Sequence, residues 1–243
     1  MKIMNKKDNQ IIFQAEIGES LANTIRKYLN QIPIIAVDEV EISKNDSPLY
    51  DETIAHRIGL IPLKMGKATN KKTIANLELS SKKEGIVYSE ELKGSVTVAY
   101  DKIPITSLKK GQELKLSATI KTKEGAKHAK FSPGLMFYRN IVDIKIDKDC
   151  PKEVVDTCPK KILKLENGKI TTAENHLECD MCEACIDACE KQGKDSIKLI
   201  PTKRLMITLE SFGQLDVKDI FKKSIDAVKR DLKEVSKKIS KVK

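Results

Sequence analysis

The chain has 243 residues, of which 40% are hydrophobic and 33% charged, and its formal net charge at pH 7 is +10. This length allows one large domain or roughly two or three small ones, with enough apolar residues for a core. No stretch approaches the roughly 18–20 apolar residues of a membrane span, and the polar start, Met1 to Gln10, lacks the apolar region of a signal peptide. We expect a cytoplasmic protein without a membrane segment.

The N-terminal part alternates between strand and helix signals. Strands are expected over 11–17 and 34–42, and a short helix over 51–59. A longer helix is expected over 20–32, because its apolar residues share one face: Leu21, Ile25, Tyr28, Leu29 and Ile32.

The middle, from about 65 to 147, is strand-like and rich in Lys and Ser. Apolar and polar residues alternate over 114–120 and 142–146, which predicts half-buried sheet. The segment 125–133, GAKHAKFSP, is expected to be an exposed basic loop. The fold class that follows is α+β.

All six cysteines lie between Cys150 and Cys189, and such tight spacing in an intracellular chain indicates metal binding rather than disulfides. The run Cys179, Cys182, Cys185, Cys189 has the C-x2-C-x2-C-x3-C spacing of bacterial-type ferredoxins, in which the fourth cysteine binds the other cluster. Glu190 replaces the proline that usually follows the run.

Cys158-Pro159 has the form of the end of a first such run, whose other three positions are Lys148, Pro151 and Val154. We therefore expect one iron–sulfur cluster, [4Fe-4S] or [3Fe-4S], held by Cys158, Cys179, Cys182 and Cys185, with Cys189 as the second choice of ligand. Cys150 and Cys189 are left over and either pair or remain thiols.

The segments around the cysteines follow a ferredoxin-like order. A hairpin is expected over 161–172, turning at Asn167-Gly168, with a short helix after Cys189 and a strand over 197–200. Zinc and an empty site are the alternatives to a cluster, because four thiolates also suit tetrahedral zinc. His176 is a candidate substitute ligand, although a surface histidine is the favoured interpretation.

The C-terminal helix carries a heptad seam. Phe221, Ile225, Val228, Leu232, Val235 and Ile239 are spaced 4-3-4-3-4. Such a seam requires a partner helix, and we favour one from another chain over packing on its own domain.

Residues 222–243 contain nine Lys or Arg and three acidic residues, so this tail carries +6 of the +10. A solvated basic face is favoured over nucleic-acid binding, since no aromatic residues interleave with the lysines.

Nothing else in the sequence resembles catalytic machinery. There is no Gly-rich phosphate loop and no GxSxG motif. Asp143, Asp147 and Asp149 are interpreted as solvated, and His56 as structural. The chain is thus expected to have no active site of its own.

The segment DETIAHRIGLIPL at 51–63, with IAVDEVEI at 35–42, closely resembles the D subunit of archaeal DNA-directed RNA polymerase. It is also similar to the third-largest subunit of eukaryotic polymerase II and to the N-terminal domain of bacterial alpha. The resemblance continues in KHAKFSP at 127–133 and ESFG at 210–213, and many archaeal D subunits carry a ferredoxin-like insert.

The resemblance implies a discontinuous alpha-NTD-like dimerisation domain formed by 1–48 and 201–243, a β-rich insert over 49–147 and an iron–sulfur module over 148–200. It implies a non-catalytic assembly platform that pairs with the L subunit, joins the N and P subunits, supports the large catalytic subunits through 51–63 and meets DNA only through the complex. The implied interface with the L subunit includes Leu21, Ile25, Tyr28, Phe221, Ile225, Val228, Leu232 and Val235.

Two other functions compete with this one. An electron carrier would usually keep both clusters or a flavin or nicotinamide motif, and it has no use for the heptad helix. A nucleic-acid-binding protein would need aromatic residues for stacking. Within the assembly hypothesis, the cluster is either a structural staple or a redox sensor, and the small module favours the staple.

Overall fold

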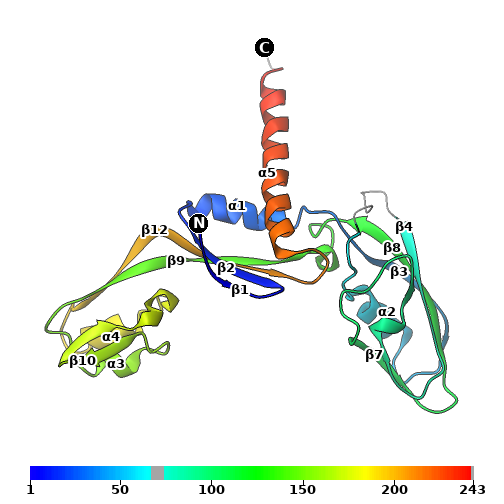
Figure 1. Ribbon diagram of the computed structural model, residues 1–243, viewed down its shortest axis with the longest axis horizontal. Coiled ribbons are helices and arrows are strands. Elements are labelled where there is room, and N and C mark those ends of the chain that lie inside the picture. Colours follow the sequence, from blue (N-terminus) through cyan, green and yellow to red (C-terminus); the bar gives the residue numbers. More distant parts are fainter. Residues whose placement is uncertain (67–73, 242–243) are drawn as a thin grey trace. The chain divides into compact units, whose positions relative to one another are not determined.

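The computed structural model describes residues 1–66 and 74–241, and the chain forms two compact units (Figure 1). The first unit comprises 1–5, 12–22 and 137–208, and the second comprises 6–11, 23–136 and 209–243. Helices and sheets are mixed, as expected of an α+β protein. The expected four-segment domain division stays a prediction, as does everything expected of residues 67–73, which lie outside the described residues.

The strands are β1 Lys2–Lys6, β2 Gln10–Ala15, β3 Ile34–Asn45, β4 Ile74–Ser81, β5 Gly85–Tyr88, β6 Lys93–Gly94, β7 Pro104–Leu108, β8 Leu114–Lys123, β9 Gly134–Ile146, β10 Leu163–Glu166, β11 Lys169–Thr172 and β12 Ile197–Ser211. The α-helices are α1 Glu19–Leu29, α2 Asp51–Gly59, α3 Val154–Thr157, α4 Ala184–Glu190 and α5 Val217–Ile239, and the 3-10 turns are η1 Ser89–Glu91, η2 Ala129–Phe131 and η3 Glu174–Glu178.

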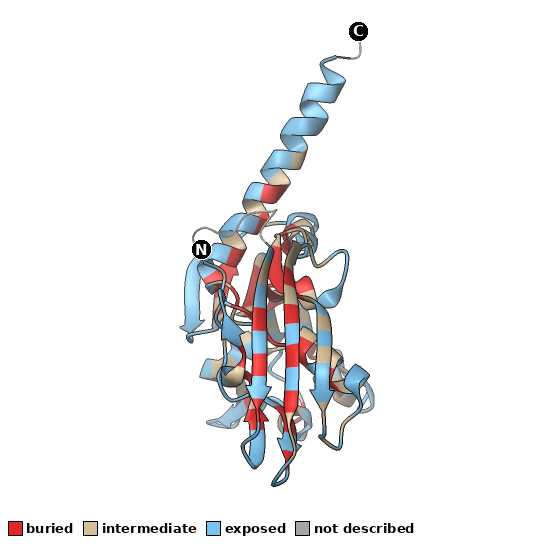
Figure 2. Ribbon diagram, turned by 90° about the vertical axis from the view of Figure 1, so that its right-hand side faces the viewer, coloured by how far each residue is buried: buried red, intermediate tan, exposed pale blue. Residues whose placement is uncertain are grey.

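The insert sheet, β3-β8-β4-β6, forms the main structure of the second unit, and β8 pairs antiparallel with both β3 and β4. The expected alternation in β8 is confirmed, because Leu114, Leu116 and Ala118 are buried while the lysine and serine residues between them are exposed. Figure 2 shows the same alternation of buried and exposed residues along the strands. One face of this sheet therefore covers a core and the other meets solvent.

Helix α2 packs beside β3, and its bounds agree with the expected helix over 51–59. Ile54 and Ile58, one turn apart, are both fully buried in the core of the insert sheet, so the polar residues of the helix remain outside. The two-stranded sheet of β5 and β7 contributes Val87, Ile105 and Leu108 to the same core.

A second sheet contains β1, β2, β12 and β9 in that order, and most of its residues belong to the first unit. The expected strands over 11–17 and 142–146 are confirmed as parts of β2 and β9. The expected helix over 20–32 is confirmed as α1, which ends at Leu29.

The cysteine module, residues 148–200 of the first unit, contains α3, the β10–β11 hairpin and α4. The hairpin turns at Asn167-Gly168 as expected, and both turn residues have positive φ, 50° and 75°, as a type I′ turn requires. The expected helix after Cys189 is wrong: α4 begins at Ala184 and ends at Glu190, so it contains Cys185 and Cys189. Glu183, with φ 60°, ends the preceding loop and lets the helix start earlier.

Candidate metal centre and interface helices

The four expected cluster ligands come from three segments of the cysteine module. Cys158 follows α3 directly, Cys179 follows η3, and Cys185 lies in the first turn of α4. Cys182 lies in the loop between η3 and α4 and is the exposed member, while the other three are half-buried. The structure thus places these four cysteines on loops and helix ends of the module.

The backbone of these loops adopts a conformation that non-glycine residues rarely accept. Lys161, Met181 and Glu183 have φ values of 52°, 56° and 60°, and each lies within three residues of an expected ligand. The fourth non-glycine residue with positive φ in the described chain is the hairpin residue Asn167. Because left-handed residues of this kind cluster at ligand sites, the loop geometry fits a group held by the cysteines.

The thiols lie within electrostatic range of one another. Burial, followed by the neighbouring Cys158 and Cys179 sulfurs, raises the pKa of the Cys185 thiol to about 11. Burial also raises the pKa of Cys179, and the backbone N–H of Met181, which donates to its sulfur, opposes that shift. In the absence of a cation, each neighbouring thiolate makes the next one harder to form.

Backbone N–H groups point at the sulfurs. Ile162 N donates to Cys158 Sγ at 3.5 Å, and the N–H of Ile186 donates to Cys185 Sγ. Such N–H···S hydrogen bonds are among the protein's means of tuning a bound cluster. Within residues 1–66 and 74–241, no group of three or more Cys, His, Asp or Glu converges closely enough to hold a single metal ion.

Arg139 of β9 holds the cysteine loop, a role that no sequence pattern predicts. Its Nη1 donates to the carbonyl oxygen of Cys179 at 2.8 Å, and its Nη2 donates to that of Leu177 at 2.7 Å. A guanidinium can satisfy two carbonyls at once because its N–H groups form a rigid fork. Arg139 thereby fixes the point where the loop enters the cysteine run.

The two leftover cysteines are neighbours. Cys150 Sγ and Cys189 Sγ lie 3.9 Å apart as free thiols, and Cys189 is buried in the small core of the module. Burial and the adjacent Cys189 raise the pKa of Cys150 to about 12. His176 is exposed, as the interpretation of a surface histidine expected, and its ring approaches the carbonyl oxygen of Ala173 at 3.3 Å.

Helix α5 has two different apolar stripes. Val217, Ile220, Ser224 and Ala227 are buried within the chain, a stripe that the sequence interpretation missed although its i, i+3, i+7, i+10 spacing was visible. The heptad seam follows another line along the helix. Its members Phe221 and Ile225 are half-buried, whereas Leu232 and Val235 are 63% and 52% exposed.

The expected interface residues of α1 differ in exposure. Leu21 is 47% exposed, but Ile25 is buried in the fold of the chain itself. Tyr28 is half-buried, and burial together with the hydrogen bond to Asp231 of α5 raises the pKa of its hydroxyl. Of these three expected interface residues, Leu21 is thus the most accessible to a partner.

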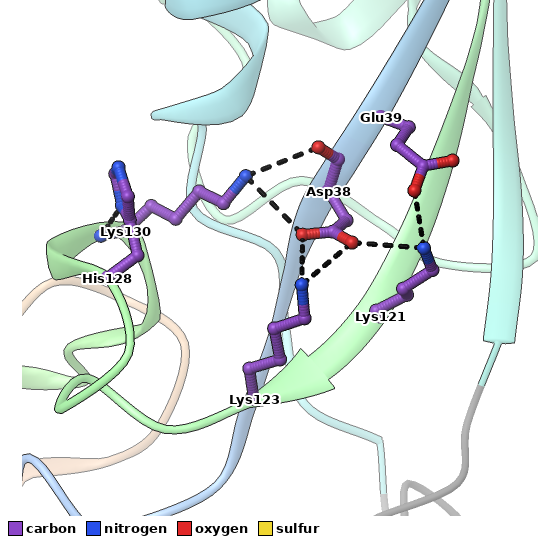
Figure 3. A network of polar contacts seen from close by, with 6 residues as sticks. All are labelled: Asp38, Glu39, Lys121, Lys123, His128 and Lys130. Carbon is purple, nitrogen blue, oxygen red and sulfur yellow. Dashed lines mark hydrogen bonds and ion pairs between the residues drawn. The ribbon is translucent and has the colours of Figure 1, made fainter.

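The expected exposed basic loop over 125–133 is confirmed over 126–129 but is wrong at its C-terminal end. Phe131 is buried, and Lys123 and Lys130 lie over its ring with Nζ at 5.7 and 5.4 Å from the centroid. Lysines of this region also make a long-range contact that the local sequence does not reveal, with the Asp38 carboxylate (Figure 3).

Asp38 is the centre of that network. Lys123 Nζ contacts both of its carboxylate oxygens, at 2.7 and 2.9 Å, and Lys121 Nζ lies 3.1 Å from one of them. Lys130 Nζ donates to the Asp38 carbonyl oxygen at 3.4 Å. These lysine contacts, the hydrogen bond from Lys123 first, lower the pKa of Asp38 although burial opposes the shift. The network connects the loop before β9 to β3.

The segment 51–63 combines a buried and an exposed side. Leu63 belongs to the core of the insert sheet, whereas Leu60 and the preceding Tyr50 are 54% and 81% exposed. His56 and Arg57 are also exposed, and Arg57 Nη1 donates to the Ile105 carbonyl oxygen at 2.8 Å. The three expected solvated carboxylates, Asp143, Asp147 and Asp149, are all exposed, as predicted.

The insert sheet and its α2 helix define the class of the protein. Residues 23–137 match the family model of the RNA polymerase Rpb3/RpoA insert domain. This match includes β3, α2, β8 and the loop that carries Phe131.

Relatives extend the match to nearly the whole chain. DNA-directed RNA polymerase subunit Rpo3 of Pyrococcus furiosus is 34% identical over 236 residues, covering 90% of this chain and 89% of that protein. Its counterpart Rpo3 of Archaeoglobus fulgidus is 28% identical over 263 residues, covering 100% and 98%. DNA-directed RNA polymerase II subunit rpb3 of Dictyostelium discoideum is 28% identical over 283 residues, covering 97% and 93%.

The chain therefore belongs to the Rpo3/Rpb3 family of DNA-directed RNA polymerase subunits. Its archaeal relatives carry the name Rpo3 rather than the letter D, so the family expected from the sequence is confirmed while that designation is not. None of the helices in the described part of the chain has the length and apolarity needed to cross a membrane.

Proposed function

We propose that this chain is a non-catalytic assembly subunit of an archaeal DNA-directed RNA polymerase, in the position that the resemblance assigned to the D subunit. It pairs with the L subunit, joins the N and P subunits, supports the large catalytic subunits and meets DNA only through the complex, in the cytoplasm. The observation that carries the proposal is the exposure pattern of helix α5. The helix buries one stripe of residues within its own chain and leaves Leu232 and Val235 of the heptad seam exposed.

The test is co-expression of the full chain with the L subunit. Copurification in a one-to-one complex is expected, and the double variant Leu232→Ser/Val235→Ser should weaken it by removing apolar area from the seam. The matched control Lys223→Ser/Lys237→Ser lies on the outer side of the same helix and should leave the complex intact. A chain that stays a stable monomer in the presence of the L subunit would overturn the proposal.

We further propose that Cys158, Cys179, Cys182 and Cys185 hold one iron–sulfur cluster. The left-handed residues in the cysteine loops and the N–H groups aimed at Cys158 and Cys185 support this assignment. The spacing supports a cluster over zinc, because zinc sites more often use two separated C-x2-C pairs than a run of three cysteines.

The proposed role of the cluster is structural. The described residues of the cysteine module contain a small hydrophobic cluster whose buried members are Val154, Leu163, Cys189 and Ile197. Cores of this size rarely hold a fold without a metal or disulfides. When bound, the cluster supplies metal–thiolate bonds that tie together the segments after α3, after η3 and at the start of α4, and this binding energy acts as folding energy.

Iron and acid-labile sulfide analysis of anaerobically purified protein tests the ligand set. Cys158→Ser and Cys179→Ser should lose both elements, and Cys189→Ser should retain them. Unchanged iron in Cys179→Ser would remove the cluster assignment. If Cys189→Ser loses iron and sulfide while Cys158→Ser retains them, Cys189 rather than Cys158 is the fourth ligand. Stoichiometric zinc without iron would establish the zinc alternative.

A further inference from the structure

The exposed part of the α5 seam is suited to a second helix. Leu232, Val235 and Ile239 follow one another at spacings of 3 and 4 and are 63%, 52% and 67% exposed. They occupy the a and d positions of a heptad, and the last turns of the helix are exposed on all sides (Figure 2). An apolar stripe of this kind does not by itself decide which helix covers it, because any amphipathic helix offers a complementary stripe.

The charged residues beside the seam do discriminate between possible partner helices. With the seam residues at a and d, the flanking e and g positions are Lys222, Ser224, Lys229, Asp231, Ser236 and Lys238. The three lysines are exposed, whereas Ser224 is buried. The single acid, Asp231, is half-buried and already bonds to the Tyr28 hydroxyl. The flanks therefore present positive charge to whatever covers the seam.

A second copy of this chain would meet these flanks with lysines of its own. In an antiparallel helix pair the e residues of one helix face the e residues of the other, so Lys222 and Lys229 would meet lysines of the second copy, and like charges there oppose pairing. The tail carries +6 over residues 222–243, and this net charge also opposes the approach of a second copy. A helix with Asp or Glu at its flanks would instead form opposite-charge pairs with the lysines.

We propose that the lysine flanks of α5 exclude a homodimer and select, as the occupant of the seam, an amphipathic helix with acidic flanking positions. This inference rests on the proposed function in one respect: it specifies the chemistry of the helix with which the assembly partner covers α5. The apolar seam supplies affinity and the flanks supply the choice of partner.

Two differently tagged copies of the full chain, co-expressed, test the exclusion. Two wild-type copies should not copurify. Wild type should copurify with the Lys222→Glu/Lys229→Glu chain, in an amount at low salt at least roughly ten-fold greater than with a second wild-type copy, because the reversed flanks now attract. Adding Leu232→Ser/Val235→Ser to the reversed chain should abolish the pairing. High salt should also weaken it, since the flanks are exposed to solvent.

The matched control is Lys223→Glu/Lys237→Glu, which makes the same change in net charge on the side of α5 opposite the seam. It should pair with wild type no better than wild type pairs with itself. Equal copurification of the flank and control variants, or efficient copurification of two wild-type copies, would overturn the proposal. The assay contains none of the other polymerase subunits, so its result does not depend on whether the chain binds the L subunit.

Two synthetic helical peptides with an identical apolar seam, one flanked by Glu and one by Lys, test the selection on the full chain. Fluorescence anisotropy should show that the Glu-flanked peptide binds at least roughly ten-fold more tightly, a difference of about 1.4 kcal/mol. Equal affinities would overturn the selection, even if the L subunit copurifies through the seam.

Discussion

The core of the insert sheet contains seventeen buried apolar side chains among the described residues, whereas that of the cysteine module contains four. The insert core draws on β3, β4, β5, β7, β8 and α2, so distant parts of the sequence stabilise one another. In the module, one of the four buried residues is itself a cysteine, and Cys150, Cys158 and Cys185 pack around them. Apolar burial accounts for the stability of the first region, whereas the second has a small core and, under the proposed assignment, relies on its cluster.

Removal of iron should have the largest effect and should be confined to the module. If the cluster provides the folding energy of residues 148–200, chelation under anaerobic conditions should reduce amide protection there to that of an unfolded segment. The protection of β3, β4 and β8 should not change. Hydrogen exchange with mass spectrometry measures both regions in one sample. Equal protection of the module with and without iron would contradict the structural role.

Ile58→Ala is the converse experiment on the insert sheet. Ile58 is fully buried in the core, and truncation of such a residue should lower the free energy of unfolding by about 2–5 kcal/mol. Chemical denaturation followed by circular dichroism measures the loss, and iron content per chain should stay at the wild-type value. The neighbouring exposed His56→Ala is the control, with an expected change within about 0.5 kcal/mol.

Arg139 tests the dependence of the module on one positioning contact. Arg139→Gln removes the charged donors to the Cys179 and Leu177 carbonyls, which should cost roughly 1.5–3 kcal/mol and make iron release to a chelator about ten-fold faster or more. Arg139→Lys should rescue the rate only in part, because an ammonium lacks the fork.

Arg204→Gln is the matched control for Arg139. Arg204 lies on β12 and its Nη2 comes only to 4.0 Å from Asp143, so iron release should be unchanged. If Arg139→Gln and Arg204→Gln release iron at the same rate, the contact with the cysteine loop has no positioning role.

Local signals predicted much of this structure, and long-range contacts limited the rest. The Asn167-Gly168 turn, the bounds of α2 and the seam of α5 each follow from residues a few positions apart. The contact of Lys130 with Asp38 joins residues 92 positions apart, and that of Arg139 with Cys179 joins residues 40 positions apart. No periodicity encodes such pairings, so neither the lysine contacts of Asp38 nor the role of the arginine was predicted.

The Asp38 network supplies the smallest effect and a pH signature. Its contacts with lysines lower the pKa of Asp38, so the stabilisation is present above the unfolded-state pKa of about 3.9 and is lost as pH falls through the lower folded-state pKa. Asp38→Asn should therefore cost about 1–3 kcal/mol at pH 7, and its difference from wild type should shrink below about pH 4.

Glu39→Gln is the control for Asp38, because Glu39 contacts Lys121 at 2.6 Å but is 67% exposed, and such pairs contribute about 0–1 kcal/mol. Urea denaturation at pH 7, 5 and 3 measures both variants. A pH-independent loss in Asp38→Asn would mean that packing rather than charge connects the loop to β3. The insert would then depend on apolar contacts even at its charged rim, which would sharpen its difference from the module, where ligand chemistry is expected to dominate.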